Sequence, residues 1–181
     1  RGWIAVNLAK FVWGAGGVVV AGRNPERLEW LRTVGADDVI ALGTDDLTES
    51  VVAQHSARPF DAVIDYLWGT SAQQTLAALA AAHPSAHFHA TRFIQVGSMT
   101  GASIQIDAAT LRSTGITLQG VGIGSVPPEA LQRARTEGLP RLFAMLDAGE
   151  LQLTTVARPL ADIENVWAAK EPSGTRVVIT P

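Results

Sequence analysis

The stretch "GGVVVAGRNPERL", Gly16 to Leu28, decides the fold. Its glycines lead into the β-branched run 18–20, which ends at "GRNP" before a new helical pattern begins. A short apolar run of this kind is typical of a parallel strand that is buried on both faces. Asn24 can cap the following helix, with Pro25 at its first position. The stretch therefore predicts a strand, a tight turn and a helix.

Strands and helices continue to alternate on both sides of this stretch. Apolar residues at helical spacing predict a helix over about 3–13. Further strands are expected at 37–42, 60–67, 92–98 and 116–124, with helices at 25–34, 45–57 (entered at Thr44 or Asp45), 71–82 and 107–113. Such alternation is typical of βαβ units. The predicted fold class is α/β, a doubly wound parallel sheet with helices on both faces.

The last third of the chain follows a different pattern. A long helical stretch over 127–151 is expected to be interrupted near Gly138 and Pro140. A strand, a helix and a second strand are expected within 153–181. We therefore predict one α/β domain over 1–127, a bridging helical segment over 128–150, and a segment of another structural unit over 151–181.

Composition limits the classes of function. The chain has 181 residues, 47% hydrophobic and 17% charged, with a net charge of −3. This composition is typical of a globular protein, and it argues against nucleic acid or an anionic membrane as a partner. The chain has no cysteine, which excludes disulfides and Cys-ligated zinc and is compatible with a cytoplasmic location. No apolar run is long enough to suggest a membrane span.

The turns that follow the predicted strands are the candidate binding elements. In an open parallel sheet, ligands bind at the carboxyl ends of the strands. These turns lie at 21–25, 41–46, 66–71, 96–101 and 120–126, and four of them are rich in Gly, Ser or Thr. Glycine in any one of them can simply make a tight turn. Several such turns at one edge of a sheet favour a cofactor site.

Arg23 stands at the end of the strand quoted above. In a dinucleotide-binding fold, an acidic residue at this point binds the 2′-hydroxyl of NAD, whereas an arginine accommodates the 2′-phosphate of NADP. A guanidinium matches phosphate oxygens with a planar set of donors. The alternative is an exposed arginine without a ligand, since only two of the 14 basic residues are lysines. We favour NADPH over NADH.

The histidines and paired carboxylates are expected to be structural. His83, His87 and His89 could in principle hold a metal, but they follow a helix, at the opposite edge from the candidate turns. A polar surface loop is the favoured interpretation. His55 is expected to be structural or exposed. The pairs at 37–38 and 45–46 are expected to be caps or solvated faces.

The order of these elements resembles the medium-chain dehydrogenase/reductases, including zinc-type alcohol dehydrogenases and especially quinone-oxidoreductase-like members. "GWIAVNLAK" resembles the helix after the family's glycine-rich turn, and "VVVAGRNPERLEWLRTVGADDVIAL" its second strand, helix and third strand. "FDAVIDYLWG", "FIQVGS" and "LRSTGITLQGVGIG" resemble the later strands, and "LFAMLDAGEL", "ARPLADIENVWAAK" and "GTRVVITP" the closing segment. The resemblance covers nearly the whole chain and implies a Rossmann-type fold.

The resemblance also implies a set of coenzyme-binding residues. Gly2 would lie under the pyrophosphate, and three residues would surround the adenosine phosphate. The others would line the path to the nicotinamide, where hydride is exchanged with a small-molecule substrate. The residues around the adenosine phosphate are Gly22, Arg23 and Asn24. Those along the path to the nicotinamide are Tyr66, Leu67, Gly97, Ser98, Gly122, Ile123 and Gly124. A homodimer through the edge of the strand at 116–124 is also implied.

Two departures from the family limit these expectations. The family's catalytic domain and first Rossmann strand would precede Gly2. That strand is central in the order 3-2-1-4-5-6, so its absence would leave unpaired backbone, and we expect a fragment or unrecorded upstream residues. No catalytic residue is assigned, and zinc binding is not supported by this chain. A non-catalytic module that senses NADPH or scaffolds a complex is the alternative function.

Overall fold

A computed structural model of the chain describes residues 2–82, 88–151, 153–169, 171 and 175–181. Its contacts divide the chain into two compact units. One comprises Arg1–Ala41 and Leu131–Pro181, and we refer to it as the terminal unit. The other comprises Leu42–Ala130, the central unit.

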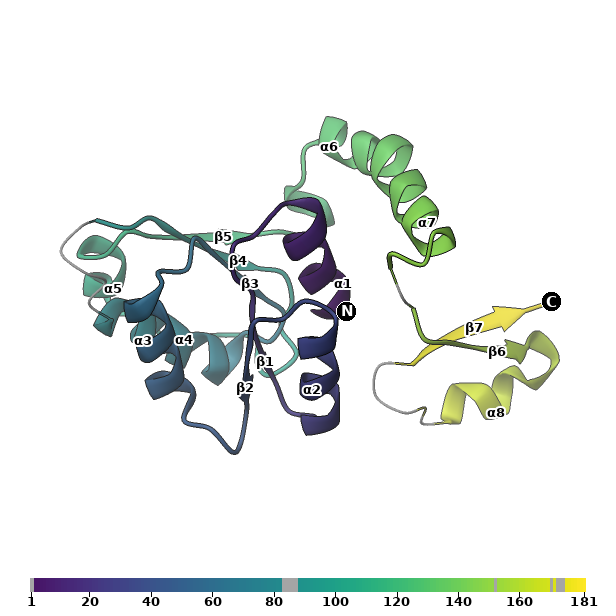
Figure 1. Cartoon of the computed structure of the whole chain (residues 1–181), viewed down its shortest axis with the longest axis horizontal. Helices are drawn as coiled ribbons and strands as arrows, with labels where there is room; N and C mark the ends of the chain where they lie inside the picture. The colour runs from purple at the N-terminus through teal and green to yellow at the C-terminus, as the bar shows by residue number, and fades with distance from the viewer. Residues whose placement is uncertain (1, 83–87, 152, 170, 172–174) are drawn as a thin grey trace. The chain divides into compact units, whose positions relative to one another are not determined.

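The terminal unit begins with the strands and helices on either side of residues 16–28 (Figure 1). Its elements are α1 (Gly2–Asn7), a π-helical turn η1 (Leu8–Val12), β1 (Val19–Gly22), α2 (Pro25–Thr33) and β2 (Asp38–Ala41). β1 and β2 pair in parallel, with Val20 opposite Val39. Trp3 and Val6 of α1 are buried with Leu28 and Leu31 of α2. This apolar core is the reason that α1 and α2 lie side by side.

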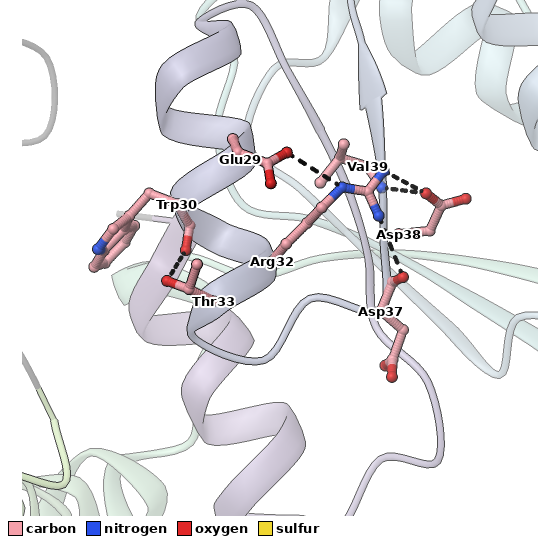
Figure 2. A network of polar contacts seen from close by, with 7 residues as sticks. All are labelled: Glu29, Trp30, Arg32, Thr33, Asp37, Asp38 and Val39. Carbon is pink, nitrogen blue, oxygen red and sulfur yellow. Dashed lines mark hydrogen bonds and ion pairs between the residues drawn. The ribbon is translucent and has the colours of Figure 1, made fainter.

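The carboxyl-terminal end of α2 is anchored to the start of β2 by a polar network (Figure 2). An Arg32 guanidinium nitrogen donates to Asp38 Oδ1 at 2.8 Å, and Arg32 Nε lies 3.8 Å from a carboxylate oxygen of Glu29. The neighbouring Asp37 carboxylate accepts from Lys10 Nζ at 2.7 Å and from the Val18 backbone N–H at 2.7 Å. These two carboxylates, expected to be caps or solvated faces, are therefore engaged in ion pairs.

The last part of the chain is helical and then βαβ, and it belongs to the terminal unit from Leu131 onward. α6 (Pro128–Arg133), η3 (Ala134–Gly138) and α7 (Leu139–Asp147) follow one another without a coil (Figure 1). The expected interruption is a π-helical turn before Pro140, because proline lacks the N–H that an α-helical turn requires there. β6 (Thr155–Pro159), η4 (Leu160–Asp162), α8 (Ile163–Ala168) and β7 (Arg176–Thr180) complete the unit, and β6 pairs with β7 in parallel.

The central unit contains a three-stranded parallel sheet in the order β3-β4-β5. Its elements are α3 (Leu47–Ala57), β3 (Ala62–Asp65), α4 (Gly69–Ala81), β4 (Thr91–Gln95), α5 (Ala108–Arg112), β5 (Ile116–Gly120) and the 3₁₀ turn η2 (Ile123–Ser125). The apolar side chains of Leu76 in α4 and Phe93 in β4 are each 1% exposed, so they belong to the core of this unit. α3 and α4 lie side by side (Figure 1).

The expected alternation of strands and helices is confirmed, and the strands are parallel as predicted. Asn24 caps α2 as expected, because its Oδ1 accepts the Arg27 backbone N–H at 2.9 Å. The entry to α3 was predicted wrongly: Asp46, rather than Thr44 or Asp45, caps the helix by accepting the Glu49 N–H. The boundaries near 127 and 150 and the strand expected before Gly2 stay predictions.

Candidate functional site

The turn between β1 and α2 presents Arg23 to solvent. Gly22 ends the strand, and the Asn24 side-chain oxygen is occupied by capping the helix. The Asn24 amide nitrogen has no protein partner in the described part of the chain, so it can donate to a ligand. The turn therefore offers one guanidinium and one amide donor, a donor set that suits a phosphate.

Arg23 differs from the arginines that follow it in α2. The Arg27 guanidinium stacks over the Trp30 ring at 3.6 Å, and burial lowers the pKa of Arg27. Arg32 pairs with Asp38 and Glu29. Arg23 is exposed and makes no hydrogen bond or ion pair with any residue that the structure describes. The fold thus uses Arg27 and Arg32 for its own stability and leaves the Arg23 cation available.

Gly2, which was expected under the pyrophosphate, begins α1 and is exposed. A Cβ atom at Gly2 would meet nothing within 4 Å among the described atoms. Packing within the terminal unit therefore does not explain why this residue is glycine, and the expected role of Gly2 stays a prediction.

In the central unit, the turn after β3 is organised by Asp65. Its side chain is buried, and its two carboxylate oxygens accept the backbone N–H groups of Leu67 at 3.0 Å and Trp68 at 2.9 Å. The Asp65 carbonyl oxygen accepts the N–H of Val96 at 2.7 Å, which joins this turn to the end of β4. Tyr66 and Leu67, predicted site residues, are half-buried within this turn.

The turn after β4 approaches the Asp65 turn so closely that it requires glycine. A Cβ atom at Gly97 would lie 2.5 Å from the Tyr66 carbonyl oxygen. Thr100 completes the contact: its N–H donates to the Leu67 carbonyl at 2.8 Å, and its hydroxyl donates to the Trp68 carbonyl at 2.7 Å. The structure thus brings the predicted residues Tyr66, Leu67 and Gly97 together. Ser98 is exposed beside them.

The predicted residues Gly122, Ile123 and Gly124 lie in the turn after β5. The Val121 N–H donates to the Gln95 carbonyl at 2.8 Å, which places this turn next to the end of β4. The Gly122 N–H donates to Ser125 Oγ at 2.9 Å, and Ile123 is 86% exposed. The three turns of the central unit therefore share one edge of its sheet, as the parallel arrangement requires.

A cavity of about 270 Å³ lies beside the turn after β2, another expected candidate turn. Gly43, Asp45 and Asp46 line one side, and Ser71 and Gln74 of α4 line the other. Two carboxylates repel a phosphate. This cavity therefore suits a neutral hydrogen-bonding group better than an anionic one.

The histidines lie at the other end of the central sheet. His55 is 4% exposed, and its Nδ1 accepts the Phe60 N–H at 3.0 Å, so it is structural. Burial lowers the pKa of His55, and His89 lowers it further. His89 Nε2 lies 3.1 Å from the Phe60 carbonyl oxygen. The loop prediction for His83 and His87 lies outside the described residues.

Sequence reasoning missed Asp65, Trp68 and Thr100 as organisers of this edge. An acidic residue at the end of a strand pattern is a signal for an Asx-type turn, and it could have pointed to Asp65. Trp68 and Thr100 carry no such signal, because their positions depend on the meeting of two turns about 30 residues apart in sequence.

The comparisons with known proteins decide the family. The family model described as "Zinc-binding dehydrogenase" matches residues 2–137. The chain belongs to this family. The resemblance to medium-chain dehydrogenase/reductases is therefore confirmed. The comparison with curated proteins found no match.

Solved structures that are similar to this chain share its fold. A quinone oxidoreductase from Pseudomonas syringae pv. tomato is 17% identical, with a TM-score of 0.72, over 99% of this chain and 53% of that chain. An alcohol dehydrogenase zinc-binding domain protein from Burkholderia ambifaria is 20% identical, with a TM-score of 0.71, over 92% and 42%. Benzyl alcohol dehydrogenase from Acinetobacter calcoaceticus is 22% identical, with a TM-score of 0.67, over 92% and 42%. The chain thus spans about half the length of these structures.

The residues that the structure describes do not form a site for the zinc ion that the family name implies. The described ranges contain no group of three or more His, Cys, Asp or Glu side chains placed to hold a metal.

Within the described ranges, no helix has the length and apolar character that crossing a membrane requires.

Proposed function

We propose that this chain is the coenzyme-binding portion of an NADPH-dependent oxidoreductase that reduces a quinone, enone or carbonyl compound. Arg23 carries the proposal. It is an exposed cation at the carboxyl end of a parallel strand, and no described residue pairs with it. Membership of the family and the oxidoreductase descriptions of similar structures support the class of reaction.

In this proposal, Arg23 binds the 2′-phosphate of the coenzyme, and Asn24 Nδ2 donates a second hydrogen bond. The turns after β3, β4 and β5 contact the nicotinamide-bearing half through their backbone groups. The bound coenzyme supplies the hydride, and the protein holds the coenzyme in position. The small-molecule substrate and its binding residues are not assigned.

The test is a calorimetric titration of the full-length protein with NADPH and with NADH. We expect NADPH to bind more tightly. Arg23→Ala should weaken NADPH about 10- to 100-fold, because a charge-assisted phosphate contact contributes about 1.5–3 kcal/mol. Binding of NADH should change by less than about twofold, since it lacks the 2′-phosphate.

Arg58→Ala is the matched control, because Arg58 is an exposed arginine between α3 and β3, before the strand and not in the turn that follows it. It should leave both affinities unchanged. Equal binding of NADPH and NADH by the wild type would refute the role of Arg23. Tight NADPH binding without turnover on a panel of quinones, enones and aldehydes would favour the sensor or scaffold function instead.

We also propose that the protein forms a homodimer through β5. Among the described strands β5 pairs with β4 alone, so its second edge offers backbone donors and acceptors to another copy. Sedimentation should show a dimer, and Thr117→Lys, which adds a charge to this exposed edge, should weaken it. A cytoplasmic location stays a prediction.

A further inference from the structure

Trp68 has the most unusual backbone conformation in the central unit. Its φ is 58° and its ψ is −155°. Across the described ranges it is the one residue other than glycine with a positive φ. A side chain in this region clashes with its own backbone, so glycine is strongly favoured there. The conformation is therefore held by the surrounding structure.

Hydrogen bonds on both sides of Trp68 hold this conformation. Its N–H donates to Asp65 Oδ2 at 2.9 Å, and its carbonyl accepts the Thr100 hydroxyl at 2.7 Å. Gly69, the next residue, also has a positive φ of 55°, and a Cβ atom there would lie 2.8 Å from the Thr100 carbonyl oxygen. The backbone is thus fixed, and with it the direction in which the indole leaves the chain.

No polar or aromatic contact in the described fold explains why this position carries an indole. The Trp68 side chain is half-buried, like its neighbours Tyr66 and Leu67, and it makes no hydrogen bond and no ring contact with a described residue. Glycine would satisfy the same backbone bonds without strain. A large aromatic ring retained against strain, beside the turns at the carboxyl ends of β3 and β4, points to contact with a ligand.

We propose that the Trp68 indole forms an aromatic wall of the coenzyme site and stacks against the nicotinamide-bearing half of the bound dinucleotide. This inference rests on the proposed function. An indole offers a flat apolar face for a planar ring, and stacking of this kind adds to affinity beyond the area that it buries. The clamp formed by Asp65 and Thr100 would then serve to aim the ring.

The test compares Trp68→Gly, Trp68→Ala and Trp68→Phe in the full-length protein. Affinity for NADPH is measured by calorimetry, which does not depend on tryptophan fluorescence. We expect the Gly and Ala variants to raise the Kd by the same factor of about 5 to 10, because both remove the ring. The Phe variant should stay within about threefold of the wild type, since it keeps an aromatic face.

The same variants test the strain independently of binding. The thermal unfolding midpoint of Trp68→Gly should exceed that of Trp68→Ala by about 2–4 °C, because glycine alone tolerates the positive φ. Ordinarily alanine is the more stabilising of the two residues. Trp167→Ala is the control, since Trp167 is 87% exposed and lies in the terminal unit, and it should leave the Kd unchanged.

The outcomes separate this inference from the proposed function. If the wild type binds NADPH and Trp68→Ala binds it equally well, the aromatic wall is refuted and the proposed function stands. A Phe variant as weak as the Ala variant would also refute stacking. If the wild type binds neither NADPH nor NADH, the proposed function fails and the inference fails with it.

Discussion

The turn after β1 and the turn after β3 stand at equivalent ends of parallel strands, but they are built in opposite ways. Gly22 and Arg23 lie in an open turn, where the nearest atoms to a new Cβ at Gly22 belong to the Leu28 side chain, at 3.1 Å, and not to backbone. The turn after β3 is locked by a buried carboxylate and by a second turn at van der Waals distance.

This difference shows two ways to build a turn at the carboxyl end of a parallel strand. A turn that binds through one long side chain needs little from its own backbone, because the side chain reaches the ligand by rotation. A turn that presents backbone groups, or a side chain from a strained backbone, must fix its backbone beforehand. Substitutions should therefore affect stability strongly in the second turn and weakly in the first.

The largest expected effect is that of Gly97→Ala. Its Cβ would lie 2.5 Å from the Tyr66 carbonyl oxygen, so backbone must move, and we expect a loss of about 2–4 kcal/mol in the free energy of unfolding. Gly22→Ala should cost less than about 1 kcal/mol, because the Leu28 side chain can shift. Urea denaturation measures both, and equal costs would remove the contrast between the turns.

Asp65→Asn comes next. The amide replaces one acceptor oxygen by an NH₂ group that faces a backbone donor, so we expect a loss of about 2 kcal/mol. Asp61→Asn is the matched control, since the Asp61 side chain is 89% exposed and its 3.5 Å pairing with His89 should contribute less than about 0.5 kcal/mol. An unchanged free energy of unfolding in Asp65→Asn would mean that the turn does not depend on the Asp65 carboxylate.

We expect the stability of the central unit to depend on pH because of His55. Its pKa is lowered by burial and by His89, so the folded state takes up this proton less readily than the unfolded state. Stability is then fully present above the ordinary pKa of about 6.5 and falls as the pH drops below it, by at most about 1.4 kcal/mol per pH unit.

Urea denaturation at pH 7.5 and 5.5 measures this effect. His55→Gln should lose less stability on acidification than the wild type, although it starts lower because a buried hydrogen bond is altered. His89→Gln controls for the second histidine of the pair. An unchanged acid loss in His55→Gln would assign the pH dependence to other groups.

The smallest expected effect is that of Arg23→Ala on stability. Arg23 is exposed and has no protein partner within the described ranges, so the free energy of unfolding should change by less than about 0.5 kcal/mol. A larger loss in thermal or urea unfolding would show that the fold uses Arg23, and it would weaken the assignment of this residue to a phosphate.

The sequence by itself determined the local elements and the family. The β-branched run before Gly22, the cap at Asn24 and the alternation of apolar runs depend on neighbouring residues, so their strands and helices could be predicted. The exposed position of Arg23 follows from the same local logic. Asp46 was missed as a cap because three adjacent polar residues could each have served.

Only the tertiary structure decided how the turns of the central unit meet. The clamp of Thr100 on Leu67 and Trp68 and the approach of Gly97 to Tyr66 join segments about 30 residues apart, and no local pattern encodes that contact. The same holds for Trp68, whose positive φ would predict glycine from local sterics alone. Long-range hydrogen bonds override that local preference, and for this physical reason the backbone conformation of Trp68 could not be predicted.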